Sequence, residues 1–228
     1  MKKLIVISLG GSVIVPDNIN YLFLDRFKKT LKKFYKTHKF VIVCGGGVIA
    51  RKYIEALRKE GKSKMEQSLA GIRATRTNAL FMIQFFGKEA NDTLPLNMKE
   101  VMSNIHKNSV VFCGSLRFIE DSTSDETAAK LAGLLKTDFI NITNVDGLYT
   151  TDPNKNKDSK FIPTISFKEF EEKAHKIKHK AGQHFVLDQK SSSLIRGHKI
   201  KTYIINSDLS NFTNLLKQKK FKGTTIYG

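Results

Sequence analysis

The sequence LIVISLGGS at residues 4–12 joins a short apolar run to two glycines and a serine. The run from Leu4 to Leu9 has the length of one strand and stops abruptly at Gly10 and Gly11, which predicts a β-strand followed by a tight turn. Because the run is apolar on both faces, we expect its strand to lie inside a sheet that helices cover on both sides.

The same kind of apolar run recurs along the chain, separated by segments in which apolar residues repeat with helical spacing. The further runs are Phe40 to Cys44, Val110 to Cys113, Phe139 to Thr143 and Thr202 to Asn206. The helical segments are Leu22 to Tyr35, Ala50 to Lys59, Gln67 to Phe86 and Glu126 to Leu135. This alternation predicts βαβ units, and therefore an α/β fold with three αβα layers around a central, mainly parallel sheet.

The last third of the chain has weaker signals. Ser166 is in position to cap a helix that runs to about His175, and Ser210 to cap a last helix that runs to about Lys219. The β-prone stretch from Thr224 to Tyr227 predicts an edge strand. We expect one domain over residues 1–228, divided into lobes of about residues 1–130 and 131–228.

Composition limits the class of protein. The chain has 228 residues, of which 40% are hydrophobic, and this is enough to bury a full core. No signal-peptide pattern and no run of membrane-spanning length is present, so we expect a cytoplasmic protein without a membrane partner. Cys44 and Cys113 each end an apolar run, which favours buried thiols over a disulfide or a zinc site.

The charge is strongly basic, because 39 Lys and Arg residues against 21 Asp and Glu residues give a net charge of +18. Clustered basic residues mark nucleic-acid binders, and such a protein would bind DNA or RNA with a steep dependence on salt. Here the lysines are spread along the chain, and no helix-turn-helix, zinc-finger or aromatic RNA-binding motif accompanies them. We therefore expect a solvated lysine-rich surface that attracts anionic substrates, and not a nucleic-acid partner.

Three loops carry the chemistry. Gly10-Gly11 and Gly45-Gly46-Gly47 follow apolar strands, and glycine turns there let backbone N–H groups approach an anion closely. The third loop, TNVDGLYTTDP at residues 143–153, has side chains suited to holding a base and a metal-bound phosphate. Together the loops predict a phosphoryl-transfer enzyme.

Two other glycine-loop classes fit less well. The pattern Gly45-x-Gly47-x-x-Ala50 also matches a dinucleotide-binding fingerprint, which needs an acidic residue about twenty positions on, at the end of the next strand. Glu66 has that spacing, but the residues before it, Lys62 to Met65, have no strand character. No Gly-x-x-x-x-Gly-Lys-Ser/Thr sequence occurs, which excludes a P-loop enzyme.

At these residues the chain resembles the amino acid kinase superfamily, and is most similar to its archaeal-type uridylate (UMP) kinase branch. The motifs occur in the family's order and cover nearly the whole chain. They are Gly10 to Ser12 with Val13 to Pro16, Gly45 to Tyr53, Gly71 to Ala79, Thr123 to Asp125, Thr143 to Pro153, Ala181 to Asp188, and Gly223 to Ile226.

The resemblance implies the carbamate kinase-like fold of that superfamily, with an N-terminal lobe that binds the acceptor and a C-terminal lobe that binds ATP. It also implies ATP- and Mg²⁺-dependent phosphorylation of UMP to UDP, and a homo-oligomer, which is often a hexamer in the family. By the same resemblance, two positions differ from common family patterns. Ser8 stands where many members have a lysine, and Ser68 stands where UMP kinases usually have an aspartate.

The resemblance further implies roles for individual residues. The catalytic group would comprise Gly10, Gly11, Arg51 and Asp125, with Asp125 organising the charged centre. Residues on the ATP side would be Ser12, Gly47, Arg51, Thr143, Asn144, Tyr149 and Asp152. Residues on the UMP side would be Gly46, Ser68, Thr123 and Ser124. No protein residue is assigned as a metal ligand.

The chemistry of such a transfer asks for positioning more than for covalent help. A nucleoside monophosphate has a second phosphate pKa near ~6, so it is largely dianionic at neutral pH and needs no general base. In-line placement, Mg²⁺ on the ATP phosphates, cations and backbone N–H groups would supply the catalysis. Of the six scattered histidines, only His184 lies in a family-like stretch.

Two alternatives remain open at the level of the sequence. The first is another small-acceptor kinase of the superfamily, such as one that phosphorylates isopentenyl phosphate, because the acceptor loop from Gly114 to Ser122 lacks a Pro-Gly turn and contains Arg117. The second is a non-catalytic nucleotide-binding subunit, which Ser8 and Ser68 would favour. Turnover of an acceptor other than UMP would support the first alternative, and turnover of no acceptor would support the second.

Overall fold

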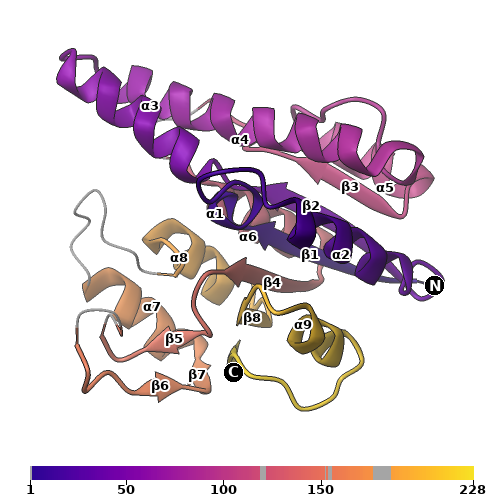
Figure 1. The fold of residues 1–228 in the computed structure, drawn as a ribbon. Helices are drawn as coiled ribbons and strands as arrows, with labels where there is room; N and C mark the ends of the chain where they lie inside the picture. Colours follow the sequence, from indigo (N-terminus) through magenta and orange to yellow (C-terminus); the bar gives the residue numbers. More distant parts are fainter. Residues whose placement is uncertain (1, 119–121, 152, 154–155, 177–185) are drawn as a thin grey trace.

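The computed structural model describes residues 2–118, 122–151, 153, 156–176 and 186–228. Two residues singled out from the sequence, Asp152 and His184, lie outside these ranges. Figure 1 shows a twisted central sheet with helices on both sides, and a pair of long helices, α3 (Gly47–Lys59) and α4 (Lys64–Phe86), projecting together from one end.

The main sheet has seven strands among the described residues, in the order β3-β2-β1-β4-β8-β9-β7. They are β1 (Lys3–Leu9), β2 (His38–Cys44), β3 (Val110–Cys113), β4 (Asp138–Thr143), β7 (Thr164–Ser166), β8 (Thr202–Asn206) and β9 (Thr224–Tyr227). The pairing of β8 with β9 is antiparallel, and the other five pairings are parallel. The predicted α/β class with a mainly parallel sheet is therefore confirmed.

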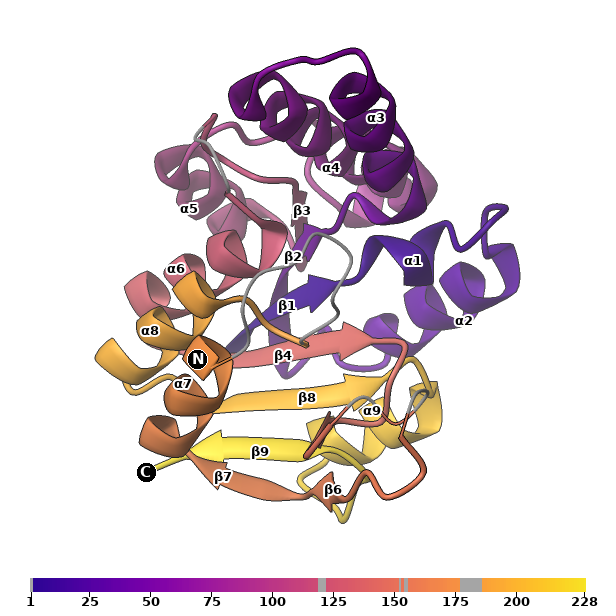
Figure 2. The same cartoon turned by 90° about the vertical axis from the view of Figure 1, so that its left-hand side faces the viewer.

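Alternate residues of β1 enter two different hydrophobic cores, which explains why the strand is apolar on both faces except at Lys3 and Ser8. Ile5, Ile7 and Leu9 pack with α1 (Gly11–Ile14), α2 (Tyr21–Lys32), α4 and α9 (Leu209–Leu216) on one face. Val6 packs on the other face, whose core includes α6 (Ser124–Leu135), α7 (Phe167–Lys176) and α8 (Gln189–Gly197). These are the three predicted layers, and Figure 2 shows α6 and α8 beside the sheet on the side away from α2.

The predicted helices begin where local capping sets them. Ser63 forms a capping box with Glu66 at the start of α4, so the residues before Glu66 begin a helix and do not form the strand that a dinucleotide-binding unit requires. Ser166 exchanges hydrogen bonds with Glu169 at the start of α7, as predicted. The predicted cap of α9 is wrong, because Asp208 caps that helix and accepts the Ser210 N–H at 2.8 Å.

Several elements differ from the sequence prediction. The stretch Thr224–Tyr227 forms β9, as expected, but it is not an edge strand, because β7 pairs with it in parallel and takes the edge. A small antiparallel pair also forms from β5 (Leu148–Tyr149) and β6 (Phe161–Ile162). The structure adds α1, α5 (Met98–Lys107), α8 and the short 3₁₀ helix η1 (Gly87–Glu89) to the predicted helices.

The parallel strands bring distant loops to one edge of the sheet. β1, β2, β3, β4 and β8 point the same way, so the segments after their last residues meet at their common carboxyl edge. Cys44 and Cys113, which end β2 and β3, are free and fully buried, and burial raises the pKa of both thiols. The sheet contains strands from both predicted lobes, whereas the division into lobes itself stays a prediction.

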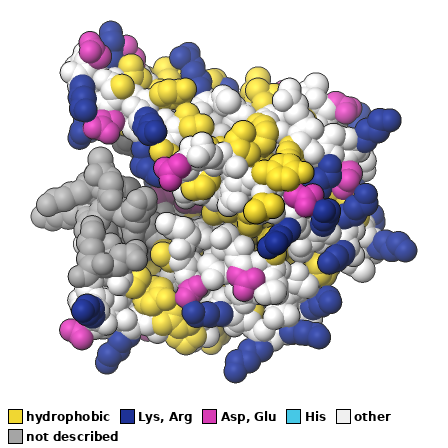
Figure 3. All heavy atoms as spheres, in the orientation of Figure 1, with side chains coloured by type: hydrophobic (Ala, Val, Ile, Leu, Met, Phe, Trp, Pro, Cys, Tyr) yellow, Lys and Arg dark blue, Asp and Glu magenta, His cyan; other side chains and the backbone are white. Residues whose placement is uncertain are grey.

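The surface carries the excess of positive charge without one concentrated basic region on the face in Figure 3, where Lys and Arg side chains are scattered. No helix in the described ranges is long and apolar enough to cross a membrane.

Candidate active site

The two glycine turns at the carboxyl edge of the sheet pack directly against each other. A Cβ atom on Gly11 would lie 2.2 Å from the Gly47 nitrogen, and one on Gly47 would lie 2.4 Å from the Gly11 carbonyl carbon. Gly47 also has φ +60°, a conformation that other L-residues rarely adopt. The sequence analysis attributed these glycines to the close approach of an anion, but at Gly11, Gly45 and Gly47 the backbone of the other glycine turn fills the space of the missing side chain.

The packing of the turns leaves a set of amide donors unused. The N–H groups of Gly11, Ser12, Gly46 and Gly47 donate no hydrogen bond to any other residue that the structure describes. Gly46 is the N-cap of α3, and it has no side chain to cap the helix. Free N–H groups at the start of a helix attract anions through their own polarity and through the helix dipole.

A carboxyl group lies below the first turn. Asp125, in the first turn of α6, accepts a hydrogen bond from the Ser8 hydroxyl at 2.6 Å, and Ser8 is buried at the end of β1. The pKa of the Asp125 carboxyl is raised to about 7, mainly by burial; the Ser8 hydrogen bond opposes this shift, and the negative charge of Asp188 contributes to it. The site therefore favours the neutral carboxyl group of Asp125, and an approaching cation would favour the ionised carboxylate.

Thr123 and Ser124, the neighbouring residues predicted to bind the acceptor, lie at the start of α6. Thr123 caps α6 by accepting the Glu126 N–H, and it donates its hydroxyl hydrogen to Asp188. Asp188 itself caps α8, accepting hydrogen bonds from the backbone and side chain of Ser191. Ser124 is the first residue of α6 and is partly exposed. Thr123 thus joins α6 to α8, and both Thr123 and Ser124 are partly exposed.

Helix α4 supports the edge from the side. Asn78 donates to the Gly45 carbonyl at 2.7 Å, which holds the second glycine turn. Thr75 accepts the Ser115 N–H, and the Arg76 side chain donates to the carbonyl oxygens of Ser115 and Leu116. The Arg76 guanidinium also lies 3.9 Å from the centre of the Phe118 ring. These contacts fix the loop after β3, which the sequence placed beside the acceptor.

Two further predicted residues lie on the α3–α4 pair. Ser68 is partly exposed on α4, one turn before Gly71, and the Gly71 carbonyl oxygen would lie 3.4 Å from a Cβ atom on Gly46. Arg51, one turn into α3, is exposed and has no ion pair with a described residue. Arg51 is thus near the second glycine turn in sequence, whereas Ser68 comes near it only through the fold of α4.

The loop predicted to hold ATP starts at the same edge. Gly10 donates its N–H to Ile142 at 3.0 Å, which places the first turn beside the end of β4 at Thr143. Asn144 is exposed, and Tyr149 in β5 packs edge-on against Phe161 with 5.4 Å between ring centres. Three of the four residues assigned to this loop lie within the described ranges, and Asp152 does not.

The loop has structural anchors that the sequence analysis did not identify. Asp146 accepts a hydrogen bond from Asn206 at 2.6 Å and pairs with Lys222 at 2.5 Å. The Leu148 N–H donates to the Thr224 hydroxyl at 2.7 Å. These contacts tie the loop after β4 to β8 and β9, and therefore set its position over the sheet.

The structure brings most of the predicted site residues to one edge but adds others. Gly10 to Ser12, Gly45 to Gly47, Asp125 and Thr143 meet there, with Ser68 and Arg51 alongside. Sequence reasoning assigned no role to Thr75, Arg76, Asn78, Asn206 or Asp188. The first three lie inside the motif from Gly71 to Ala79 that supports the family resemblance, so that motif held the signal for them.

The chain is similar to known proteins over nearly its whole length. A model of the amino acid kinase family matches residues 3–206. The chain is 37% identical to a uridylate kinase from Thermoplasma volcanium over 227 residues, which are 99% of this chain and 98% of that protein. It is 34% identical to a uridylate kinase from Pyrococcus abyssi over 224 residues, covering 97% of this chain and 98% of that one.

Solved structures agree in fold. The crystal structure of uridylate kinase from Archaeoglobus fulgidus superimposes with a TM-score of 0.85 at 32% identity, covering 99% of this chain and all of that one. UMP kinase from Ureaplasma parvum, at 21% identity, superimposes with a TM-score of 0.81 and covers both chains completely, which shows the shared fold.

Proposed function

This chain belongs to the amino acid kinase family, and from that premise we propose that it transfers the γ-phosphoryl group of ATP to UMP, giving UDP and ADP. The observation that carries phosphoryl transfer is the set of amide N–H groups at Gly11, Ser12, Gly46 and Gly47 that donate to none of the described residues. Such donors bind phosphate oxygens and stabilise the charge that develops on a transferring phosphoryl group. The near full-length similarity to uridylate kinases supports UMP as the acceptor.

The two reactants would meet over the glycine turns. Gly10, Gly11 and Ser12 line the path of the phosphoryl group, with Gly47 and Arg51 on the ATP side and Gly46 on the UMP side. Thr143, Asn144, Tyr149 and Asp152 hold ATP, whereas Ser68, Thr123 and Ser124 hold UMP. Arg51 is an exposed cation one turn into α3, the helix that starts at the second glycine turn, so we assign it to the transferring phosphate.

The interlocked turns give this arrangement its rigidity. Because each turn excludes a side chain on the other, neither can move without opening the contact between them. The amide donors are therefore held in place before the substrates arrive, and no binding energy is needed to order them. Preorganised donors are the main requirement for a reaction in which the phosphate acceptor needs no general base.

Mg²⁺ fits this site as a companion of ATP. No group of three or more His, Cys, Asp or Glu side chains in the described ranges could hold a metal ion. Mg²⁺ commonly binds through substrate phosphates, water and at most one or two carboxylates, and Asp125 is a carboxylate at this edge. When bound, the ion neutralises charge on the ATP phosphates.

Asp125 would organise the charge of the site. Its carboxyl has a raised pKa, because burial opposes ionisation, so an approaching cation favours the ionised form and gains a partner of opposite charge. Ser8, which replaces the lysine of many family members, gives Asp125 a neutral hydrogen-bond donor in place of a fixed positive charge. The cations of the reaction would then come from Arg51 and from the metal bound to ATP.

The direct test is a coupled ADP-release assay with Mg²⁺–ATP and one acceptor at a time: UMP, CMP, isopentenyl phosphate, glutamate or aspartate. We expect turnover with UMP to exceed that with every other acceptor. Preference for isopentenyl phosphate would identify a different kinase of the family. ATP binding without turnover of any acceptor would identify a non-catalytic nucleotide-binding subunit.

A further inference from the structure

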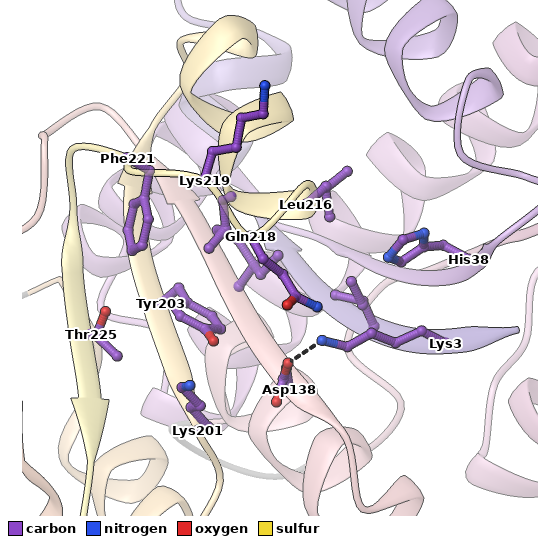
Figure 4. A pocket seen from close by; sticks show the side chains of 13 residues that line it. Lys3, His38, Asp138, Lys201, Tyr203, Leu216, Gln218, Lys219, Phe221 and Thr225 are labelled. Carbon is purple, nitrogen blue, oxygen red and sulfur yellow. Dashed lines mark ion pairs between the residues drawn. The ribbon is translucent and has the colours of Figure 1, made fainter.

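A cavity lies at the opposite edge of the sheet from the glycine turns. It has a volume of about 430 Å³ and opens where β1, β4 and β8 begin, next to the end of α9 and the segment that joins α9 to β9. Figure 4 shows its lining side chains. We call it the amino-edge pocket, and nothing in the proposed kinase reaction uses it.

The wall of the amino-edge pocket is aromatic and aliphatic. Tyr203 on β8 and Phe221 before β9 pack edge-to-face, with ring centres 5.8 Å apart and planes at 78°. Aliphatic side chains complete this wall: Ile5, Ile140, Leu215 and Leu216. A surface of this kind receives a planar or apolar group, since aromatic rings offer large contact areas.

The polar groups of the pocket are mainly cationic. Lys3 pairs with Asp138 at 2.8 Å, and the Lys201 ammonium group lies 5.6 Å from the centre of the Tyr203 ring. Figure 4 shows Lys3 and Lys201 on either side of Asp138, with Lys219 extending at the rim. Within the described part of the chain, Lys219 has no carboxylate at ion-pair distance.

These charges do not cancel. Three lysines and one aspartate line the pocket, so the positive charges exceed the negative by about two. His38 also lines it, but burial and the nearby Lys3 lower the pKa of its imidazole, which favours the neutral form. An excess of this size matches a dianion, and Gln218 and Thr225 add neutral hydrogen-bonding groups.

We propose that the amino-edge pocket binds a small phosphate ester, with its phosphate near Lys201 and its planar or apolar part against Tyr203 and Phe221, while Lys219 at the rim adds electrostatic attraction. The combination of dianionic charge and a ring-sized apolar wall distinguishes this class from inorganic phosphate and from neutral aromatic compounds. The ligand does not compete with the reactants for space, because β1 spans the sheet between the two sites and a seven-residue strand is about 20 Å long.

The test is calorimetric titration of the full chain with three probes: phenyl phosphate, inorganic phosphate and phenol. We expect phenyl phosphate to bind more tightly than either of its halves. The double variant Lys201→Gln, Lys219→Gln should bind it at least about tenfold more weakly, because it removes the charge-assisted contact of Lys201 and the attraction of Lys219 at the rim. Phe221→Leu should weaken phenyl phosphate and leave inorganic phosphate unchanged.

A matched control separates the pocket from general attraction to a basic protein. Lys217→Gln, Lys220→Gln removes the same charge from neighbouring exposed lysines that do not line the pocket, and it should bind phenyl phosphate within about twofold of the parent protein. Equal losses in both double variants would overturn the proposal, as would equal affinities for phenyl phosphate and inorganic phosphate.

A second control locates the bound probe. Arg51→Ala alters the glycine-turn edge and should leave phenyl phosphate binding unchanged, whether or not the chain phosphorylates UMP. Loss of binding in Arg51→Ala would assign the probe to the glycine-turn edge and overturn the proposal. Thermal melting of each variant shows that it is folded, and Lys201 and Lys219 are exposed enough for substitution to spare the core.

Discussion

At the scale of single residues, the hydrogen bond between Ser8 and Asp125 is the most informative contact of the proposed active site. It joins residues 117 positions apart and places a carboxyl group beneath the first glycine turn. Because burial disfavours the charged form, this carboxyl destabilises the folded protein whenever it is ionised. A buried carboxyl group whose ionised form destabilises the fold is typical of a functional site.

Replacing Asp125 by Asn should therefore stabilise the protein in a pH-dependent way. The pKa of the Asp125 carboxyl is about 7 in the folded protein against an ordinary value of 3.8, so the protein with Asp125 loses stability as the pH rises between these values. We expect Asp125→Asn to raise the free energy of unfolding by roughly 2–4 kcal/mol at pH 8, with the gain vanishing toward pH 4. Urea denaturation at both pH values measures it.

The control for this prediction is Asp158→Asn, which makes the same chemical change at an exposed position. It should shift stability by less than about 0.5 kcal/mol at either pH. A gain in Asp125→Asn that is equal at pH 4 and pH 8 would contradict the role of ionisation. Turnover of UMP should fall in Asp125→Asn although the protein becomes more stable.

Arg51 and Asp152 test the two sides of the proposed reaction. Arg51→Ala should lower kcat by roughly 100-fold with little change in KM, as expected for a cation that acts mainly on the transition state. Asp152→Ala should raise the KM for ATP more than the KM for UMP. Steady-state kinetics with each substrate varied in turn provides the measurement.

Arg58→Ala is the matched control, because Arg58 is an exposed arginine further along the same helix. It should leave both kinetic constants near those of the parent protein. If Arg51→Ala and Asp152→Ala also leave them unchanged, the residues of the proposed site are wrongly assigned.

At the scale of elements, the sequence predicted the long strands and helices because each has a strong hydrophobic period. The run from Leu4 to Leu9 became β1 almost unchanged, since both of its faces are buried. By contrast β5, β6 and β7 have only two or three residues each, too few to show a period. Their pairing depends on partners far along the chain, which local sequence does not reveal.

The same limit applies to the proposed active site. Glycines after apolar runs are visible in the sequence, and so is the order of the family motifs. The mutual packing of Gly11 and Gly47 is not, because it depends on two parallel strands ending side by side. Likewise, the anchoring of Asp146 by Asn206 and Lys222 joins segments that only the finished sheet brings together.

The contact between the glycine turns leads to a stability prediction. Gly11→Ala should destabilise the protein by more than about 3 kcal/mol, or prevent folding, because its Cβ would meet backbone atoms at 2.2–2.6 Å. Gly197→Ala is the matched control, since a Cβ there meets nothing within 4 Å. It should stabilise the protein by about 0.4–1 kcal/mol.

Thermal or urea denaturation of the two variants gives the comparison. Gly11→Ala with parent-like stability would mean that the turns separate easily, and the preorganised amide donors of the proposed mechanism would then lose their basis.

At the scale of the whole molecule, the net charge of +18 sets how anions approach. The proposed substrates are both highly negative, and a positive field raises the rate at which they reach the protein. On the face in Figure 3 the basic side chains are scattered, in keeping with long-range attraction more than with a dedicated nucleic-acid surface. The net charge therefore affects how fast anionic substrates associate with the protein, and it does not determine the fold.

Salt should therefore reduce kcat/KM more than kcat. Between about 0.05 and 0.5 M NaCl the Debye length shortens from roughly 14 to 4 Å, which screens the field beyond the protein surface. We expect kcat/KM for UMP to fall several-fold while kcat changes by less than about twofold. Steady-state assays at constant pH and free Mg²⁺ measure this, and equal losses in both constants would point to an effect on the chemical step.

The position of β9 between β8 and β7 constrains the order of assembly. In the main sheet, β7 pairs with β9, a strand encoded much later in the chain. During synthesis on the ribosome, β7 and its helix α7 must therefore wait without their sheet partner until the segment from Thr224 to Tyr227 has emerged, whereas β1, β2 and β3 can already associate. Nascent chains stalled before that segment should remain protease-sensitive around β7 while their N-terminal half is already protected.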